Sequence, residues 1–403
     1  MLSVNEARGR IVAAMTLLPA SDVGIAEAFG RVLAADVTAR RTQPPHAVSA
    51  MDGYAVKAAD IATLPTVLKL VGYAPAGAAY DGALQPGEAV RIFTGAPVPD
   101  GADTVVIQED TDLDSDAVTI KDGAPGLHIR PAGLDFSEGD CLLSNGRIVT
   151  ARDAGLLAAM NRPWVKVRRK PRVAILSTGD EIVMPGDPVG PNQIVSANSI
   201  GLAATVRLFG GEPVLLGIAP DDRDGLASMA AGARGMDLLL TTGGASVGDH
   251  DLIQEVLGDA GLELDFWKIA MRPGKPLIFG DFNGTPMLGL PGNPVSSMVC
   301  ALLFLRPAMQ ALLGITDQQT HMEEAILGAS LGQNGSREDY VRAALAQDEA
   351  GRRRVMPFPV QDSSMMVPLS QSDCFIVRPP NSPPMVIDET VTILPMPISL
   401  QGF

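Results

Sequence analysis

Short apolar runs alternate with helix-like patterns through the middle of the chain, between residues 172 and 305. The runs VAILST, PVLLGIAP, DLLLTT, PLIFG and MLGL are typical of strands that are buried on both faces. The apolar spacing between and after them predicts helices over Ser199–Phe209, Leu226–Ala233, Asp251–Leu257 and Pro294–Leu305. Strands that alternate with helices in this way predict an α/β domain with a mostly parallel sheet.

Helical spacing also marks the start of the chain and the region after residue 140. Ser3 followed by Glu6 is a capping-box pattern, and apolar residues then recur at roughly helical spacing until a proline ends the run. Further helices are predicted over Ile25–Leu33 and Asp153–Met160. We interpret residues 1–38 and 140–170 as one discontinuous domain of helices and linkers.

The rest of the chain has a β-like texture. Residues 39–139 hold short β-rich runs separated by turns such as PVPDGAD and KDGAPG, which predict a small inserted β-domain of barrel-like form. Residues 319–403 show a similar pattern and predict a C-terminal β-barrel-like domain. The expected fold class is therefore multidomain α/β plus β, with a central α/β domain at 171–318, the inserted β-domain and a helical N-terminal domain.

Composition narrows the class of protein. The net charge of −15 disfavours a general DNA or RNA binder, because such a protein carries a basic surface. Cys141, Cys300 and Cys374 lie far apart without a CxxC pair, which fits a reducing cytoplasm and argues against a zinc site.

We expect no signal peptide, because Glu6, Arg8 and Arg10 interrupt the N-terminus before any long apolar stretch. We expect no membrane span, because the best apolar run, Met298–Leu305, stops at Arg306.

Three glycine-rich loops follow buried strands: STGDEI, TTGGASVG and GLPGNP. Consecutive glycines let backbone N–H groups converge on an anion, and in the third loop Pro294 opens a helix whose positive end faces the loop. A tight turn is the alternative for each loop taken alone. The candidate ligand-binding residues are Ser177, Thr178, Gly179, Asp180, Thr242, Gly243, Gly244, Ser246, Gly248, Pro291, Gly292 and the helix-capping Asn293.

Acidic residues follow two of the strands. Asp180 and Glu181 come after VAILST, and Asp221 and Asp222 come after PVLLGIAP. Carboxylates at the ends of parallel strands can hold Mg²⁺ or accept a hydrogen bond from a ring N–H or a ribose hydroxyl. Charge stabilisation of a helix N-terminus is the alternative for each pair.

Three bases stand within eight residues of this acidic chain, in WKIAMRPGKP. They are Lys268, Arg272 and Lys275. A clamp for phosphate or another oxyanion is one explanation, and ordinary surface charge is the other. The loop glycines, acids and bases together indicate an anionic, phosphate-bearing ligand held with a divalent metal.

Six motifs occur along the chain in a fixed order, which makes a match to one protein family specific. They are SAMDGYA, RIFTGAPVP, STGDEI, TTGGASVGDHD, WKIAMRPGKP and GLPGNPVS. Together they closely resemble the MoeA family of molybdopterin molybdenumtransferases, which is similar to the E domain of gephyrin. The resemblance implies a homodimer of elongated four-domain subunits, with the active cleft shared between the molybdopterin-binding domain of one subunit and the N-terminal domains of the other. It also implies the reaction: molybdenum from molybdate enters adenylylated molybdopterin, Mg²⁺ assists cleavage of the phosphoanhydride, and AMP leaves.

The resemblance also implies which residues do this work. Arg272 departs from the family pattern, in which a lysine is expected; it keeps the charge and changes the geometry. The implied ligand-binding set extends to Pro273, Gly274 and Ser363, and the implied metal ligands are Glu181, Asp221 and Asp251. The implied catalytic residues are Asp52, Thr94, Arg130, Asp135, Glu181, Asp221, Asp251, Lys268, Arg272 and Lys275.

Two other functions stay open from the sequence. A molybdopterin adenylyltransferase is one, although the long N-terminal region and the C-terminal β-domain argue against it. A purely structural dimeric scaffold is the other, although the acids and bases of the site are present. A molybdopterin adenylyltransferase and downstream molybdoenzyme chaperones are expected partners, and no nucleic acid or membrane is expected.

Overall fold

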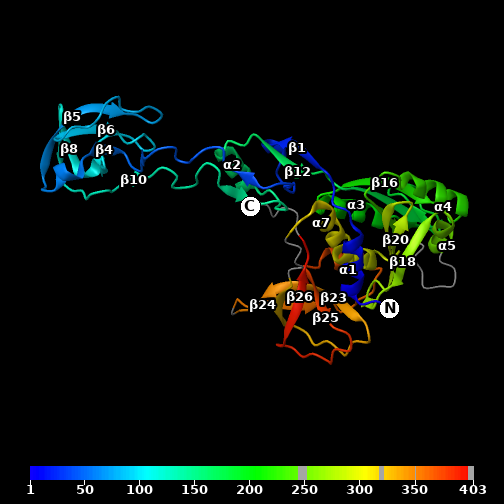
Figure 1. Ribbon diagram of the computed structural model, residues 1–403. Helices are drawn as coiled ribbons and strands as arrows, with labels where there is room; N and C mark the ends of the chain where they lie inside the picture. The colour runs from blue at the N-terminus through cyan, green and yellow to red at the C-terminus, as the bar shows by residue number, and fades with distance from the viewer. Residues whose placement is uncertain (244–251, 317–321, 350, 398–403) are drawn as a thin grey trace.

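The protein is elongated and is built from four parts. The computed structural model describes residues 1–243, 252–316, 322–349 and 351–397. Figure 1 shows a small sheet at one end, a narrow middle unit, an α/β domain at the other end, and a barrel beside the α/β domain. The chain passes through the middle unit twice, because the small sheet is inserted into it.

The α/β domain is built on a six-stranded sheet of order β16-β13-β17-β21-β20-β18. The first four strands run parallel, and β20 and β18 are antiparallel to their neighbours, so the sheet is mixed. Its strands are β13 (Arg172–Thr178), β16 (Glu212–Ala219), β17 (Leu238–Thr242), β18 (Leu262–Lys268), β20 (Pro276–Phe282) and β21 (Thr285–Leu290). The remaining elements are β14 (Ile182–Val183), β15 (Ile194–Val195), α3 (Asn198–Leu208), α4 (Arg223–Ala230), α5 (Leu252–Asp259), α6 (Pro294–Cys300) and α7 (Arg306–Leu313).

Apolar side chains cover both faces of this sheet. One core joins the α3, α6 and α7 side of the sheet to helix α1 (Val4–Ala14) and to the barrel, through residues such as Ile11, Leu240 and Phe375. A second core packs α4 and α5 on the other face, around Leu226, Leu239 and Leu257. Burial on both faces is the physical reason that the strands read as continuous apolar runs.

The helix that begins at Pro294 is longer than the sequence led us to expect. It continues through a π-helical turn over Ala301–Leu305 into α7, where Pro307 stands inside the helix. A proline has no N–H and clashes with the carbonyl four residues earlier, so a widened turn accommodates it. The whole helix, Pro294–Leu313, has 20 residues and is apolar and long enough to cross a membrane, yet 72% of its 18-residue window is buried inside the protein.

The inserted domain is a six-stranded sheet of order β7-β4-β6-β5-β9-β8. Its strands are β4 (Gly53–Val56), β5 (Thr66–Ala74), β6 (Glu88–Ile92), β7 (Thr104–Ile107), β8 (Thr111–Asp114) and β9 (Ala117–Ile120). The expected barrel does not form from these pairings, because β7 and β8 remain at the two edges of the sheet. A short ladder of β3 (Val48–Ser49) with β10 (Ile129–Arg130) joins the insert to the middle unit.

The middle unit is less helical than predicted. It contains α2 (Ala151–Ala159) and two antiparallel pairs, β1 (Ala20–Gly24) with β12 (Trp164–Arg168) and β2 (Val37–Thr38) with β11 (Cys141–Leu143). The predicted helix over Ile25–Leu33 is wrong: only a 3₁₀ turn forms, at Ile25–Glu27. Isolated β-bridges from Val32 to Ile148 and from Leu33 to Val167 use backbone N–H and C=O groups that a helix would need for its own hydrogen bonds.

The C-terminal region is a closed barrel of five strands, as its β pattern predicted. The ring of pairings runs β22-β24-β23-β25-β26 and returns to β22, and β19 (Met271–Arg272) of the α/β domain adds to β23 outside the ring. Closure leaves the ring without unpaired edges. The barrel's elements are β22 (Glu323–Leu327), β23 (Glu338–Gln347), β24 (Arg353–Pro357), α8 (Met366–Ser370), β25 (Cys374–Arg378) and β26 (Thr390–Pro395).

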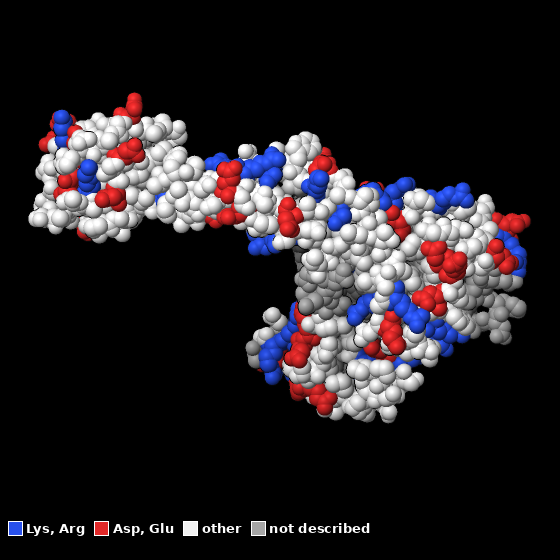
Figure 2. Space-filling model, in the orientation of Figure 1, with Lys and Arg blue, Asp and Glu red and all other residues white. Residues whose placement is uncertain are grey.

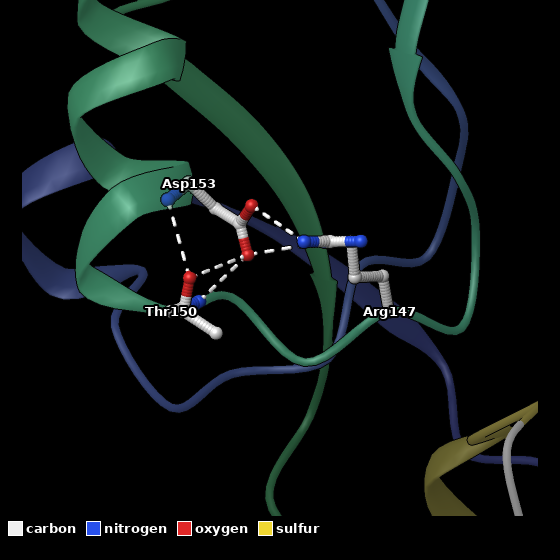
Figure 3. A network of polar contacts seen from close by, with 3 residues as sticks. All are labelled: Arg147, Thr150 and Asp153. Carbon is white, nitrogen blue, oxygen red and sulfur yellow. Dashed lines mark hydrogen bonds and ion pairs between the residues drawn. The ribbon is translucent and has the colours of Figure 1, made fainter. Parts of the chain in front are cut away.

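A buried carboxylate fixes the start of α2 in the middle unit (Figure 3). Asp153 accepts hydrogen bonds from the Thr150 backbone N–H at 2.9 Å and from the Arg147 guanidinium at 2.9 and 3.1 Å, while Thr150 Oγ1 accepts from the Asp153 N–H. Burial alone would raise the pKa of Asp153, but the bonds from Arg147 and Thr150 outweigh it and hold the pKa below its ordinary value of 3.8. The ionised carboxylate therefore stabilises the folded state.

We expect Asp153→Asn to lower the free energy of unfolding by about 1–3 kcal/mol near pH 7, because an amide cannot hold Arg147 and Thr150 in the same way. The folded-state pKa is depressed, so this stabilisation is complete above the unfolded-state pKa and is lost as the pH falls through the folded-state pKa. Urea unfolding at neutral and at acid pH measures both effects. Asp22→Asn, a change at an exposed carboxylate on β1, is the control and should show neither effect.

Candidate functional site

The functional loops meet at one edge of the α/β sheet because of its strand directions. The parallel strands β16, β13, β17 and β21 all end at this edge. Strand β20 runs opposite to β21, and β18 opposite to β20, so the loop from β18 to β20 lies at the same edge. The sheet thus brings the glycine-rich loops, the acids and the WKIAMRPGKP segment together along one line.

Asn198 holds the centre of this edge together, and no sequence motif predicted its role. Its side-chain amide donates to Thr242 Oγ1 at the end of β17 and to the Gly292 carbonyl after β21, each at 2.8 Å. Asn198 stands at the start of α3, so one side chain joins that helix to two of the glycine-rich loops. No local pattern marks such a residue, since its partners lie 44 and 94 positions away.

The loops are packed so closely that side chains would not fit. A Cβ at Gly243 would lie 2.2 Å from the Thr178 carbonyl oxygen, and φ at this residue is +94°. Below the loops, Ser177 Oγ, Thr178 Oγ1 and Thr241 Oγ1 are buried and have no hydrogen-bond partner among the described residues. Buried hydroxyls are normally satisfied, so unsatisfied ones at a sheet edge are available to a ligand.

The acids lie at the β16–β13 end of the edge. The Asp180 N–H donates to Asp221 Oδ2 at 3.3 Å, and the Asp221 N–H donates to Asp180 Oδ1 at 3.1 Å, so the two loops are tied to each other. Glu181 folds back over Gly179, where a Cβ would lie 2.5 Å from Glu181 Oε2. Helix capping, the alternative for these acids, explains only Asp222, which caps α4 through the Gly225 N–H at 2.7 Å.

The bases lie at the other end of the edge. Lys268 ends β18, with Nζ 3.3 Å from the centroid of the Trp267 ring, and the Ile269 N–H donates to the Lys275 carbonyl at 3.0 Å. Arg272 lies in β19, whose ladder with β23 attaches this loop to the barrel. Within the described part of the chain none of the three bases forms a salt bridge, so their charges are available to an anion. Successive strands are about 4.8 Å apart, so Lys268 on β18, four strands along the sheet from β13, lies roughly 19 Å from the acids that follow β13.

The barrel reaches the same edge through Ser363. Its hydroxyl accepts a hydrogen bond from Asn293 Nδ2 at 2.9 Å, and its carbonyl accepts one from the Val295 N–H at 3.1 Å. Asn293 occupies the N-cap position of α6 as predicted, with Pro294 next, but its side chain makes no capping bond. The neighbouring Ser364 instead donates to Asp362 Oδ1 at 2.6 Å.

In the inserted domain, Asp52 and Thr94 are direct partners. Asp52 Oδ1 accepts from the Thr94 N–H at 2.7 Å and from Thr94 Oγ1 at 2.8 Å, and these bonds, with the nearby Arg91, hold the pKa of Asp52 below its ordinary value. The sequence analysis did not single out Arg91. Its guanidinium lies 4.9 Å from the Tyr54 ring centroid and donates to Gln108 Oε1 at 2.6 Å. The cation is therefore held beside the carboxylate.

Arg130 and Asp135 lie apart from this pair, on the connection between the insert and the middle unit. Arg130 ends β10, opposite Val48 in the ladder with β3, and Asp135 follows it along the same connection. Both side chains are exposed. Within one chain the insert lies at the far end of the molecule from the α/β domain, as Figure 1 shows. Asp52 and Lys275 of the same chain therefore belong to separate surfaces.

Some expected residues fall outside the described ranges. Gly244, Ser246, Gly248 and Asp251 belong to residues 244–251, so the metal set of Glu181, Asp221 and Asp251 remains a prediction. In the ranges that are described, no group of three His, Cys, Asp or Glu side chains is arranged to hold a metal ion. Pro273 and Gly274 lie in the basic loop, where Gly274 packs against Cys300.

These features define a multidomain protein whose α/β domain gathers glycine-rich loops, acids and bases at one sheet edge. Three family models match the chain in order: "MoeA N-terminal region (domain I and II)" over residues 2–161, "Probable molybdopterin binding domain" over 174–311, and "MoeA C-terminal region (domain IV)" over 324–396. The chain belongs to the MoeA family.

Individual relatives agree over most of the chain. It is 39% identical over 356 residues to molybdopterin molybdenumtransferase 2 of Mycobacterium tuberculosis, covering 86% of this chain and 88% of the relative. It is 36% identical over 381 residues to the molybdopterin molybdenumtransferase of a Nostoc species, covering 92% and 87%. The crystal structure of the molybdopterin biosynthesis MoeA protein from Pyrococcus horikosii matches with a TM-score of 0.85 at 30% identity, over 98% of this chain and 99% of that one.

We expect Asn198→Ala to increase the local mobility of the Gly243 and Gly292 loops while the protein remains folded. The variant loses two hydrogen bonds, for a cost of about 1–3 kcal/mol in unfolding free energy, and frees the Gly292 loop. Hydrogen exchange should therefore rise at the amides of Gly243 and Gly292. Asn192→Ala, a change at an exposed residue of the preceding loop, should leave exchange and stability unchanged. Equal exchange in the wild type and in Asn198→Ala would show that Asn198 does not fix these loops.

Proposed function

We propose that this protein inserts molybdenum, supplied as molybdate, into adenylylated molybdopterin, with Mg²⁺-assisted cleavage of the phosphoanhydride and release of AMP. Membership of the MoeA family supports a role in molybdenum cofactor biosynthesis as a transferase. The observation that carries the finer statement is the sheet edge, where acids, buried hydroxyls and bases that form no salt bridge in the described ranges follow one another in that order.

The centre of the edge suits the phosphate part of such a substrate. Buried hydroxyls of Ser177, Thr178 and Thr241 have donors to offer, and the loop after β21 leads into the N-terminus of α6. Hydroxyl and backbone donors placed near a helix N-terminus favour negative charge. In this proposal these groups orient the pyrophosphate and do not take part in bond breaking.

The acids suit a magnesium ion at one end of the pyrophosphate. Asp180, Glu181 and Asp221 supply hard carboxylate oxygens at the ends of two neighbouring strands, and the reciprocal bonds of Asp180 and Asp221 hold these loops at a fixed separation. Mg²⁺ typically takes one or two protein carboxylates and completes its shell with water and substrate phosphates, so one or two of these acids would suffice, although the three are not grouped as one metal site in the described ranges. When bound, the ion would neutralise charge on the phosphate oxygens during cleavage.

The bases suit the second anion, molybdate, at the opposite end. Lys268, Arg272 and Lys275 form no salt bridge among the described side chains, and the β19–β23 ladder holds the loop in position. Asp339 lies opposite Arg272 in that ladder, and the charge of Arg272 acts on its carboxyl. Preformed positive groups stabilise oxyanion charge without reorganising during the reaction. Arg272 can contact two oxygens at once where a lysine would offer a point charge.

A second subunit completes the proposed cleft. Hydrogen bonds from Thr94 lower the pKa of the Asp52 carboxyl and hold it in place. Within one chain, however, the insert lies far from the α/β domain (Figure 1). A two-fold dimer that sets the insert of one subunit against the sheet edge of the other would bring both halves together. The elongated shape of the chain, with its narrow middle unit, suits this arrangement.

The reaction is tested by measuring AMP release from adenylylated molybdopterin in the presence of Mg²⁺, with and without molybdate. The proposal predicts AMP release that depends on both molybdate and Mg²⁺. Consumption of ATP with free molybdopterin, without AMP release from the adenylylated form, would assign the protein as an adenylyltransferase. A folded dimer with neither activity would favour the alternative that the protein is a structural scaffold.

We expect Asp52→Asn to abolish molybdate-dependent AMP release while leaving the melting temperature nearly unchanged. Asn Oδ1 can still accept both bonds from Thr94, so the variant removes the negative charge and keeps the local structure. Asp116→Asn, at an exposed position of the same domain, is the control and should keep full activity. Full activity in Asp52→Asn would remove Asp52 from the site.

The shared cleft predicts complementation between two inactive variants. In a hybrid of Asp52→Asn with Lys275→Met, one cleft carries both changes and the other carries neither. Random exchange of subunits gives half hybrids, each with one intact cleft, so about a quarter of the wild-type activity should return. Activity measured after unfolding and refolding the mixture gives the result, and no recovery in a mixture that forms dimers would place both residues in a cleft within one chain.

A further inference from the structure

A groove lies where the middle unit, the α/β domain and the barrel meet. Its volume is about 920 Å³, within the roughly 300–1,000 Å³ of small-molecule sites. Phe29 and Ile148 come from the middle unit, Phe209 and Arg306 from the α/β domain, and Arg353 from the barrel. The outline of the molecule is concave between the middle unit and the barrel in Figure 2, and the lining residues, not this view, define the groove.

The walls of the groove are apolar, and part of that surface faces water. Val32, Leu313 and Ile315 form a small buried cluster at its floor. At the rim, Phe29 is 57% exposed and Ile148 is 47% exposed. Exposed aromatic and aliphatic side chains over a recessed apolar floor are typical of a binding site.

Arg306 places a positive charge in the groove that no described acidic residue neutralises through a salt bridge. It is half-buried in the groove, and burial lowers the pKa of its guanidinium, with no acidic residue contributing. No salt bridge or hydrogen bond of its side chain occurs within the described ranges. A guanidinium stays protonated in proteins, and an unpaired, partly buried cation is costly unless a ligand supplies the counter-charge.

None of the acids that line the groove forms a salt bridge with Arg306 in the described ranges. Glu323 is paired with Arg353, and Asp373, which keeps its charge, accepts the Leu345 N–H at 2.8 Å. Arg207, in the last turn of α3, adds a second cation; stabilisation of the helix C-terminus explains it equally well. Arg306 stands in the interior of the continuous helix Pro294–Leu313, where stabilisation of a helix C-terminus gives no such reason for a cation.

The groove is separate from the candidate active site. Helix α3 begins at Asn198, on the sheet edge, and ends beside Arg207 in the groove. At 1.5 Å per residue its 11 residues span roughly 16 Å. The helix from Pro294 to Leu313 likewise begins at the sheet edge and ends in the groove. A ligand in the groove would thus occupy the opposite ends of both helices.

We propose that this groove binds a small amphipathic anion: one carboxylate, sulfonate or phosphate group on a flat apolar body. The acidic group would pair with Arg306, and the apolar body would lie between Phe29, Ile148 and Phe209. This inference does not depend on the molybdenum-transfer proposal, since no residue of the sheet edge takes part.

Fluorescence titration with 8-anilinonaphthalene-1-sulfonate tests the proposal on the full chain. The wild type should bind one probe per chain in a saturable way. Arg306→Gln should weaken binding at least about tenfold, because it removes the charge that pairs with the sulfonate. Phe29→Ala should also weaken binding, and since Phe29 is exposed this variant folds whether or not Arg306→Gln does.

Arg234→Gln is the matched control, because Arg234 is an exposed arginine of the α/β domain outside the groove. It should bind the probe as the wild type does. Melting temperatures of all variants separate loss of binding from loss of fold. Wild-type affinity in both Arg306→Gln and Phe29→Ala overturns the proposal, and so does the absence of saturable binding to the wild type. A crystal of the complex with the probe bound elsewhere overturns it as well.

Discussion

The backbone hydrogen-bond ladder of the central sheet is the constraint on which the rest of this structure depends. Strands β16, β13, β17, β21 and β18 run in one direction, and β20 runs opposite between the last two. The loops that follow those five strands therefore meet along one edge. A change in any strand direction would send a loop to the opposite edge, where it could not serve the same ligand. The chemistry of the site is therefore a consequence of strand order as much as of residue type.

Stability and function are in tension at that edge. Asn198 and the reciprocal bonds of Asp180 and Asp221 hold the loops together, whereas buried hydroxyls such as Thr241 Oγ1 have no hydrogen-bond partner in the described part of the chain. A protein selected for stability alone would satisfy or remove those hydroxyls. Their retention under tightly packed loops is what a preformed site for a polar, charged substrate requires.

The elongated shape separates groups that the proposed chemistry needs together. The narrow middle unit holds the inserted sheet away from the α/β domain, and the Asp153 network fixes α2 within that unit (Figures 1 and 3). A rigid spacer of this kind suits contact with another subunit better than contact within the chain. The groove beside Arg306 arises from the same architecture, because it forms only where three separate parts of the chain meet.

The sequence by itself determined the local elements and the chemistry of the loops. Buried runs and helical spacing predicted the α/β domain and the β-rich C-terminal region, and GLPGNP predicted a helix opening at Pro294, because burial and backbone preference act over short stretches. Only the tertiary structure decided the rest. Long-range bridges replaced the helix expected at Ile25–Leu33, the apolar helix continued past Pro307, and the role of Asn198 followed from partners far along the chain. Such features depend on which segments pair across the fold. The spacing of apolar residues within one segment does not predict the distant segment with which it pairs.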